Sequence, residues 1–299
     1  MQPVLSLQQI AKSYGNIQAL KGVSFEVPAG SVFGILGPNG SGKTTLLSII
    51  LDILMADSGQ FAWFGSPGSP DTRKRIGSLL ETPNFYHYLS AVDNLQITQA
   101  ISGRGTQEDI DKVLEIVKLT ARKKSRFSSY SLGMKQRLAI AAALLGDPQV
   151  LVFDEPTNGL DPVGIAEIRE LIKHLAEQGK TIIMASHLLD EVEKVCTHVA
   201  ILKQGTLLTA GEVDLVLANE DIVEVSAAIP PDQLKEALAS FPGQTHSKME
   251  GKNLQLFFPV GSANLEAINR HCFERGITLS LLLIKRKSLE AKFMELTNN

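Results

Sequence analysis

The chain has 299 residues and a formal net charge of -3 at pH 7, with 44% hydrophobic and 20% charged residues. This length predicts one main domain and a smaller additional one, with ample material for a buried core. The hydrophobic and charged shares are ordinary for a globular protein. Because the slightly acidic charge offers no electrostatic surface for nonspecific nucleic-acid binding, we expect no nucleic acid among the partners.

Cysteine usage and the start of the chain bear on the cellular compartment. Cys196 and Cys272 stand singly, without metal-site spacing, and are expected to be reduced, buried thiols in a reducing cytosol. Residues 1–15 lack the basic start, apolar stretch and cleavage site of a secretory signal. The most apolar runs, 138–145 and 279–284, are far shorter than the roughly 20 residues of a membrane-spanning helix. If the protein serves a membrane process, another chain must cross the membrane.

Short segments near the N-terminus have the pattern of partly exposed strands. They are residues 4–7, 23–27 and 60–64, with turn residues at 15–16 and 28–30. We expect these strands to form an antiparallel β layer beside the main sheet.

Three continuous apolar runs rich in Val, Ile and Phe follow a different pattern, at residues 32–36, 150–153 and 181–185. Uninterrupted apolar strands are typical of a parallel sheet that helices cover on both faces. The predicted fold class of the core is therefore α/β.

The remaining segments divide the chain further. Between residues 90 and 146 the apolar spacing is helical, which predicts a helical subdomain inserted between strands. After about residue 217 we expect a small α+β unit of the βαββαβ type. Its predicted elements are strand 222–228, helix 232–240, a weak strand near 244–248, strand 253–258, helix 262–275 and strand 277–285. The predicted domains are thus 1–217 and 218–299.

A glycine-rich loop directly after the strand at 32–36 gives the strongest motif. It satisfies GxxxxGK[ST] and precedes a helical segment, as a phosphate-binding loop requires. Its residues are Gly37, Pro38, Asn39, Gly40, Ser41, Gly42, Lys43 and Thr44, followed by Thr45. Consecutive backbone N–H groups and the helix N-terminus would hold the phosphates of a nucleotide. We expect Lys43 to reach the β- and γ-phosphates and Thr44 to bind Mg²⁺. A glycine-rich turn that merely joins strand to helix is a much weaker interpretation.

The apolar strand at 150–153 ends in two carboxylates, Asp154 and Glu155. Because side chains alternate along a strand, the two cannot play the same part. We expect Asp154 to hold Mg²⁺ and Glu155 to orient or deprotonate an attacking water. An acidic pair alone is more often a solvated turn, but its place after the phosphate loop favours the catalytic interpretation.

The stretch 130–137, YSLGMKQR, stands just ahead of a helical segment and resembles the signature motif of the ABC ATPase family. The resemblance covers about residues 4–217. It implies a P-loop NTPase fold of ABC type, with ATP and Mg²⁺ as ligands. In that family the signature helix of one chain covers the ATP bound by the other, which implies that Ser131 and Gly133 bind nucleotide across a symmetric dimer.

The motif departs from the family's usual Leu-Ser-Gly-Gly-Gln at Tyr130, Leu132 and Met134. A similar SLGMK form occurs in the bacitracin-export and lantibiotic-immunity branch, so we interpret it as a mark of that branch.

Three further residues match positions of the family. Tyr14 stands where an aromatic ring stacks on adenine, although a half-buried strand tyrosine would be the usual interpretation of this residue alone. Asp161, in the segment 158–161, resembles the loop that couples the two sites of the dimer. His187, after the strand at 181–185, matches the histidine that contacts the γ-phosphate.

Glu81 occupies the position where the family usually has glutamine. A carboxylate can bind Mg²⁺ or water but cannot donate a hydrogen bond when ionised. Glutamate at this position also occurs in the peptide-antibiotic branch. We expect Glu81 to bind nucleotide or Mg²⁺ and to touch a permease; a solvent-facing loop charge is the alternative.

The resemblance implies an ATPase subunit, peripheral on the cytoplasmic side of the membrane, that dimerises on ATP and drives a separate transmembrane permease. An exporter of antibiotic peptides or drugs is expected, with sodium ions left open as cargo. An ABC protein of translation or DNA maintenance is the alternative, although the tandem ATPase domains or long insertions of such chains are missing. A regulatory subunit without turnover is disfavoured by Asp154, Glu155 and His187.

The C-terminal domain resembles an accessory domain of exporter ATPases and could support dimerisation, regulation or partner binding. Its short basic run, 285–287, is more often a solvated strand end than a lipid-binding patch, because lipid recognition usually takes a cluster of about 4 to 8 basic residues.

Overall fold

The structure, a computed structural model, describes residues 3–80, 84–217, 220–285 and 288–298. It divides into two compact units, Met1–Val213 and Asp214–Asn299. The division falls after Val213, close to the boundary at residue 217 that the sequence predicts. Each unit has its own hydrophobic core.

The first unit is built on a six-stranded sheet with the order β5-β6-β7-β3-β8-β9, in which only the β8–β9 pair is antiparallel. Its central strands β3, β6 and β7 are buried along their whole length. This confirms the predicted α/β core with a parallel sheet. The strands are β3 (Val32–Leu36), β5 (Ile76–Leu79), β6 (Val150–Asp154), β7 (Thr181–Ser186), β8 (His198–Lys203) and β9 (Thr206–Glu212).

A second, antiparallel sheet of three strands has the order β2-β1-β4. The strands are β1 (Pro3–Tyr14), β2 (Ile17–Pro28) and β4 (Ser58–Trp63). The antiparallel layer is confirmed, but β1 and β2 are much longer than predicted because they pair with each other as one long hairpin. Helix α1 (Lys43–Ile50) lies between the two sheets and contacts β2 of one and β6 and β7 of the other. The buried indole of Trp63, on β4, donates a hydrogen bond of 2.7 Å to the carbonyl oxygen of Ile50, the last residue of α1.

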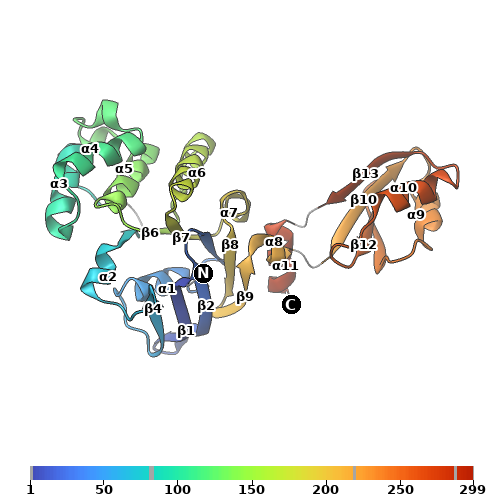
Figure 1. The fold of residues 1–299 in the computed structure, drawn as a ribbon, viewed down its shortest axis with the longest axis horizontal. Helices are drawn as coiled ribbons and strands as arrows, with labels where there is room; N and C mark the ends of the chain where they lie inside the picture. The colour runs from blue at the N-terminus through green and yellow to red at the C-terminus, as the bar shows by residue number, and fades with distance from the viewer. Residues whose placement is uncertain (1–2, 81–83, 218–219, 286–287, 299) are drawn as a thin grey trace. The chain divides into compact units, whose positions relative to one another are not determined.

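The inserted helical subdomain is also confirmed. Helices α3 (Ala91–Ser102), α4 (Gln107–Ile116) and α5 (Leu132–Leu144) lie beside one another in Figure 1. Capping boxes start α3 at Ser90 and α4 at Thr106, where the serine or threonine hydroxyl and an aspartate three residues later bond reciprocally to the backbone. Short 3₁₀ turns at Thr120–Arg122 and Phe127–Ser129 lead into α5.

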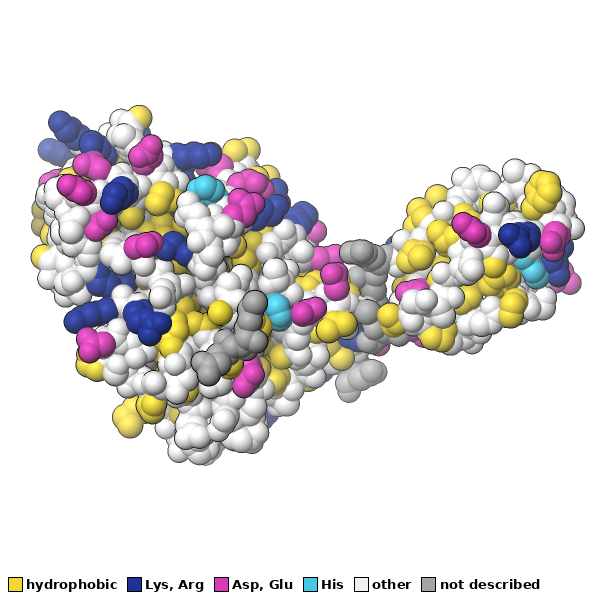
Figure 2. Space-filling model, in the orientation of Figure 1, with side chains coloured by type: hydrophobic (Ala, Val, Ile, Leu, Met, Phe, Trp, Pro, Cys, Tyr) yellow, Lys and Arg dark blue, Asp and Glu magenta, His cyan; other side chains and the backbone are white. Residues whose placement is uncertain are grey.

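The other helices of the first unit are α2 (Pro70–Lys74), α6 (Pro162–Glu177) and α7 (Leu189–Val195). Among the described residues, none of the helices of the chain combines the length and apolarity needed to cross a bilayer. On the face of the first unit that Figure 2 shows, acidic and basic side chains are interspersed.

The second unit has a four-stranded antiparallel sheet with the order β11-β12-β10-β13. Its strands and helices follow one another as the predicted βαββαβ unit, and short helices precede and follow it. The elements are α8 (Val213–Leu217), β10 (Asp221–Ala227), α9 (Pro231–Leu238), β11 (His246–Glu250), β12 (Asn253–Phe258), α10 (Leu265–Phe273), β13 (Leu279–Lys285) and α11 (Leu289–Asn298). Cys196, in the first unit, and Cys272, in the second, are both buried and free, as predicted.

Candidate active site

The glycine-rich loop joins β3 to α1 and leaves no room for side chains at two of its glycines. A Cβ at Gly37 would lie 2.4 Å from the carbonyl oxygen of Leu202, and one at Gly42 would lie 2.6 Å from that of Ala19. Gly42 also has a φ of +103°, and Gly40 a φ of +77°, which side-chain-bearing residues rarely adopt. The α1 N-terminus has no side-chain cap. Its N–H groups therefore remain available for an anion.

Lys43 directs its charge into this loop. Its side chain is only 6% exposed, and Nζ donates hydrogen bonds to the carbonyl oxygens of Gly37 at 2.8 Å and Pro38 at 3.4 Å. The same Nζ lies 3.7 Å from Oε1 of Glu155. A buried ammonium held by two carbonyl oxygens of the loop is suited to the phosphates of a nucleotide.

Thr44 and Asp154 meet beside the loop. The Thr44 hydroxyl Oγ1 donates a hydrogen bond of 2.8 Å to Oδ2 of Asp154, which is 4% exposed at the end of β6. A hydroxyl and a carboxylate at this separation fit Mg²⁺, which prefers oxygen ligands and is usually held by one or two protein groups together with phosphates and water. The predicted magnesium ligands that the structure describes are thus adjacent, whereas Glu81 lies outside the described residues.

Glu155 lies between the phosphate loop and His187. Oε2 of Glu155 is 2.8 Å from Nδ1 of His187, in hydrogen-bond contact, while Oε1 faces Lys43. The residue has a φ of +48°, a left-handed conformation that costs on the order of 1–3 kcal/mol. Asp154 contacts Thr44, whereas Glu155 contacts His187 and lies near Lys43. Because β6 ends at Asp154, this difference comes from the turn at Glu155 and not from the predicted alternation along the strand.

A pocket of about 900 Å³ is lined by Lys43, Thr44 and Glu155, while Asp154 and His187 are not among its described lining residues. Tyr14, at the end of β1, lines it and is 51% exposed, so its ring is available for stacking. Several other residues that line the pocket were not predicted from the sequence, because neither their residue type nor their spacing indicates nucleotide binding. The lining comprises Tyr14, Asn16, Ile17, Gln18, Ala19, Lys21, Asn39 to Thr45, Glu155 and Gln204.

The signature residues Ser131 and Gly133, and also Asp161, lie outside the pocket at the starts of two helices. Ser131 is the N-cap of α5, and its hydroxyl accepts a hydrogen bond of 3.3 Å from the backbone N–H of Met134. A Cβ at Gly133 would meet nothing within 4 Å. Asp161 caps α6 by accepting a 2.8 Å hydrogen bond from the N–H of Gly164. These residues are not part of the described pocket lining.

Tyr130, one of the unusual signature residues, has a structural role. It is 5% exposed, packs near Phe127 and donates a hydrogen bond of 2.8 Å to the carbonyl oxygen of Arg122. Burial raises the pKa of its phenol, which keeps it protonated as a donor. The substitution for leucine therefore anchors the loop before α5 without touching the pocket.

Comparisons with known proteins agree with this geometry. Residues 20–158 match the model of the ABC transporter family. The chain is 35% identical to an uncharacterized ABC transporter ATP-binding protein, YdbJ, of Bacillus subtilis, covering 99% of this chain and 96% of that one. It is 36% identical to the bacitracin transport ATP-binding protein BcrA of Bacillus licheniformis, covering 99% and 98% respectively.

Solved structures of ABC transporter ATP-binding subunits are similar to most of the chain. The structure of cbiO1 from Clostridium perfringens, part of the ABC transporter complex cbiONQ, matches with a TM-score of 0.67 and 27% identity, over 81% of this chain and 97% of that one. A dimeric ATP-binding cassette in a post-hydrolysis state with ADP and phosphate matches with a TM-score of 0.63 and 27% identity, over 70% and 98%. The chain therefore belongs to the ABC transporter family, as a subunit that binds and hydrolyses ATP.

Proposed function

We propose that two copies of this chain close around two molecules of ATP and thereby drive a separate permease that exports antibiotic peptides or drugs. The observation that carries the proposal is the position of Glu155, whose carboxylate lies 2.8 Å from His187 and 3.7 Å from Lys43 beside the phosphate loop. A base, a polar histidine and a phosphate-directed cation are thus gathered at one edge of the sheet.

Glu155 accepts a proton from water as that water attacks the γ-phosphorus, while the bond to the bridging oxygen breaks and ADP leaves. Lys43 and His187 lie where they can stabilise the negative charge that spreads over the transferred phosphoryl group. Mg²⁺, held by Thr44 and Asp154, would neutralise phosphate charge when bound. Tyr14 stacks on the adenine ring, which fixes the nucleotide without contributing to the chemistry.

The separation of the two anion-binding elements supports the dimer. Ser131 is exposed at the start of α5, a Cβ at Gly133 would meet nothing within 4 Å, and neither residue belongs to the described lining of the pocket that Lys43 serves. A chain with one element of each kind satisfies both when two copies meet head to tail about a two-fold axis. The similarity to a dimeric cassette with ADP and phosphate agrees with this arrangement.

A surface next to the helical subdomain is suited to the permease. A pocket of about 490 Å³ lies between the segment 84–87 and helix α3, and Tyr86 and Ile101, which line it, are 51% and 82% exposed. The ring of Tyr88 lies 5.9 Å from that of Tyr86, centroid to centroid, and is 67% exposed. Asn94 holds this segment by accepting from the N–H of Tyr86 and donating to its carbonyl oxygen. Exposed aromatic side chains on a fixed backbone are typical of protein interfaces. Glu81, just before this segment in the chain, is proposed to touch the same partner.

The proposed transported compound and cellular location are based on the similar proteins. BcrA is named a bacitracin transport protein, and cbiO1 is part of a transporter complex. We place this chain on the cytoplasmic face of the membrane, attached through its permease. The C-terminal domain, residues 218–299 by sequence, is proposed as an accessory domain that supports this assembly.

The test is a pull-down of the full chain carrying Glu155→Gln from gently solubilised membranes of the producing cells, with and without ATP. We expect ATP to trap a dimer and a polytopic membrane protein to co-purify. Glu177→Gln, at the far end of α6, is the control and should behave as the unmodified chain does. Recovery of ribosomes or nucleic acid in place of a membrane protein would overturn the proposed function.

Tyr88→Ala separates docking from catalysis. We expect this variant to hydrolyse ATP normally in isolation but to recover less of the membrane protein. If Tyr88→Ala recovers as much of the membrane protein as the unmodified chain does, the permease docks at another surface.

A further inference from the structure

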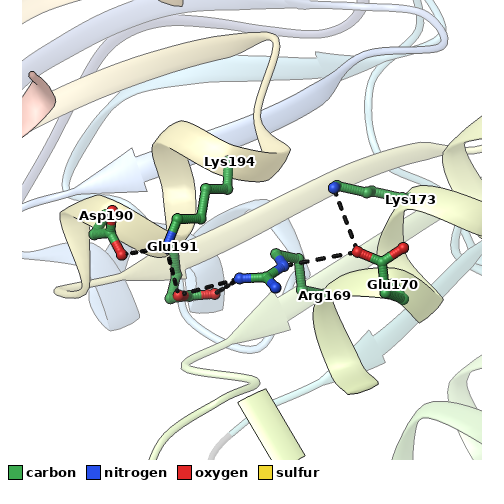
Figure 3. A network of polar contacts seen from close by, with 6 residues as sticks. All are labelled: Arg169, Glu170, Lys173, Asp190, Glu191 and Lys194. Carbon is green, nitrogen blue, oxygen red and sulfur yellow. Dashed lines mark hydrogen bonds and ion pairs between the residues drawn. The ribbon is translucent and has the colours of Figure 1, made fainter. Parts of the chain in front are cut away.

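Helices α6 and α7 each follow a loop of the site, and an ion pair joins them. Helix α6 begins directly after Asp161, and α7 begins two positions after His187. Nη1 of Arg169 on α6 donates to both carboxylate oxygens of Glu191 on α7, at 3.2 and 3.5 Å (Figure 3). The guanidinium is therefore directed at the whole carboxylate of Glu191.

This pair is better shielded than the other pairs of the network in Figure 3. The side chains of Arg169 and Glu191 are 23% and 15% exposed, whereas those of Lys173 and Glu170 are 42% and 65% exposed. Exposed ion pairs contribute little because water screens them, and a shielded, hydrogen-bonded pair holds its geometry more firmly. Lys194 adds a second cation 3.5 Å from Glu191. The carboxylate of Glu191 is thus held from two sides.

Helix α7 has no side-chain cap at its start, although the N–H of Leu188 donates a 3.0 Å hydrogen bond to Oγ of Ser186. It has seven residues, and its N-cap, Leu188, provides no side-chain hydrogen bond. Val192 is fully buried and packs near Gly34 of β3, where a Cβ would lie 2.7 Å from its Cγ1. Cys196, at the end of the helix, is also buried against Gly34, where a Cβ would lie 3.1 Å from its Sγ. These apolar contacts hold one face of α7 against the sheet, and the contact from Arg169 to Glu191 adds a polar constraint on the side that faces α6.

We propose that Arg169 and Glu191 are positioning residues that keep His187 in contact with Glu155 during ATP hydrolysis. A small rotation of α7 would move the loop at its N-terminus and lengthen the 2.8 Å contact between His187 and Glu155. The inference rests on the proposed roles of those two residues. Neither Arg169 nor Glu191 belongs to the described lining of the nucleotide pocket, so any effect of these two residues on catalysis is indirect.

The test measures steady-state ATP hydrolysis by the full chain with Arg169→Met, Glu191→Gln and the double charge reversal Arg169→Glu/Glu191→Arg. We expect each single variant to lower kcat about tenfold, because misplacing a catalytic group by about 1 Å can cost on the order of a hundredfold. The KM for ATP should stay within about twofold, because the phosphate loop is untouched. The charge reversal restores an ion pair between the two helices but places the new cation beside Lys194 and the new anion beside Glu170, so it should recover part of the lost kcat.

The matched control is Asp190→Asn, which removes an exposed ion pair with Lys194 inside the same helix. It should leave kcat unchanged. Loss of kcat in Asp190→Asn equal to that in Glu191→Gln would indicate general damage to α7 and overturn the proposal. A raised KM at unchanged kcat in Glu191→Gln would overturn it as well.

His187→Ala, assayed in parallel, distinguishes two failures. If His187→Ala keeps normal turnover, the proposed role of His187 fails and this inference fails with it. If His187→Ala loses turnover while Glu191→Gln keeps it, only the positioning role is wrong. Glu191→Gln retains the shape of the side chain, so it tests the charge even if Arg169→Met does not fold.

Discussion

The hydroxyl of Thr44 donates a 2.8 Å hydrogen bond to the carboxylate of Asp154, although the two residues are 110 positions apart. This contact joins the first turn of α1 to the end of β6. It places two oxygen ligands side by side at the edge of the phosphate loop, which makes their shared role in binding Mg²⁺ directly testable.

Replacing Thr44 with valine keeps the shape of the side chain but removes the oxygen ligand. We expect at least about a tenfold higher Mg²⁺ concentration for half-maximal ATP hydrolysis, since a lost oxygen contact weakens metal binding. Thr44→Ser retains the hydroxyl and should titrate as the unmodified chain does. Equal Mg²⁺ dependence of the valine and serine variants would contradict the assignment.

Gly42→Ala should disturb the loop more than Gly40→Ala. Both glycines have positive φ, but only at Gly42 would a Cβ meet backbone, 2.6 Å from Ala19 O, while at Gly40 it would meet nothing within 4 Å. Overpacking of this kind costs about 1–3 kcal/mol, which we expect as the extra loss of unfolding free energy in Gly42→Ala. Urea denaturation of both variants measures it. Equal losses would show that φ alone matters.

Tyr14→Ala should raise the KM for ATP about fivefold and leave kcat unchanged, because stacking of a base on an aromatic ring contributes at least about 1 kcal/mol. Tyr14→Phe keeps the ring and should behave normally. Tyr88→Ala removes another exposed tyrosine far along the chain and serves as the control. A fall in kcat with unchanged KM in Tyr14→Ala would argue against stacking.

The lowered pKa of Asp93 predicts that this residue contributes to the free energy of unfolding in a pH-dependent way. Hydrogen bonds from the Ser90 hydroxyl and backbone N–H, at 2.6 and 3.0 Å, lower the pKa of this carboxyl. A folded-state pKa below the unfolded value stabilises the fold at neutral pH, and this contribution disappears as the pH falls through the unfolded value of about 3.9 and below. Asp93→Asn should therefore be less stable at pH 7 and approach the unmodified chain below about pH 4. Urea titrations across this range measure the difference; a constant difference would contradict the prediction.

Local motifs predicted much of the site. The phosphate loop and the strand that ends in Asp154 and Glu155 are contiguous, so their residues already specify their own backbone and chemistry. The strands β8 and β9 and the full length of the β1–β2 hairpin were missed, because their pairing depends on partners far along the chain. Gln204, in the turn between β8 and β9, reaches the pocket for the same reason.

The sequence by itself determined the α/β core, the phosphate loop and the order of its motifs, because each depends on residues within one strand, turn or helix. Only the tertiary structure decided which of them touch. His187 meets Glu155 because β6 and β7 are parallel neighbours whose carboxyl ends lie at one edge of the sheet. Arg169 meets Glu191 because α6 and α7 pack together. Such contacts follow from how strands align and helices pack, which no short stretch of sequence specifies.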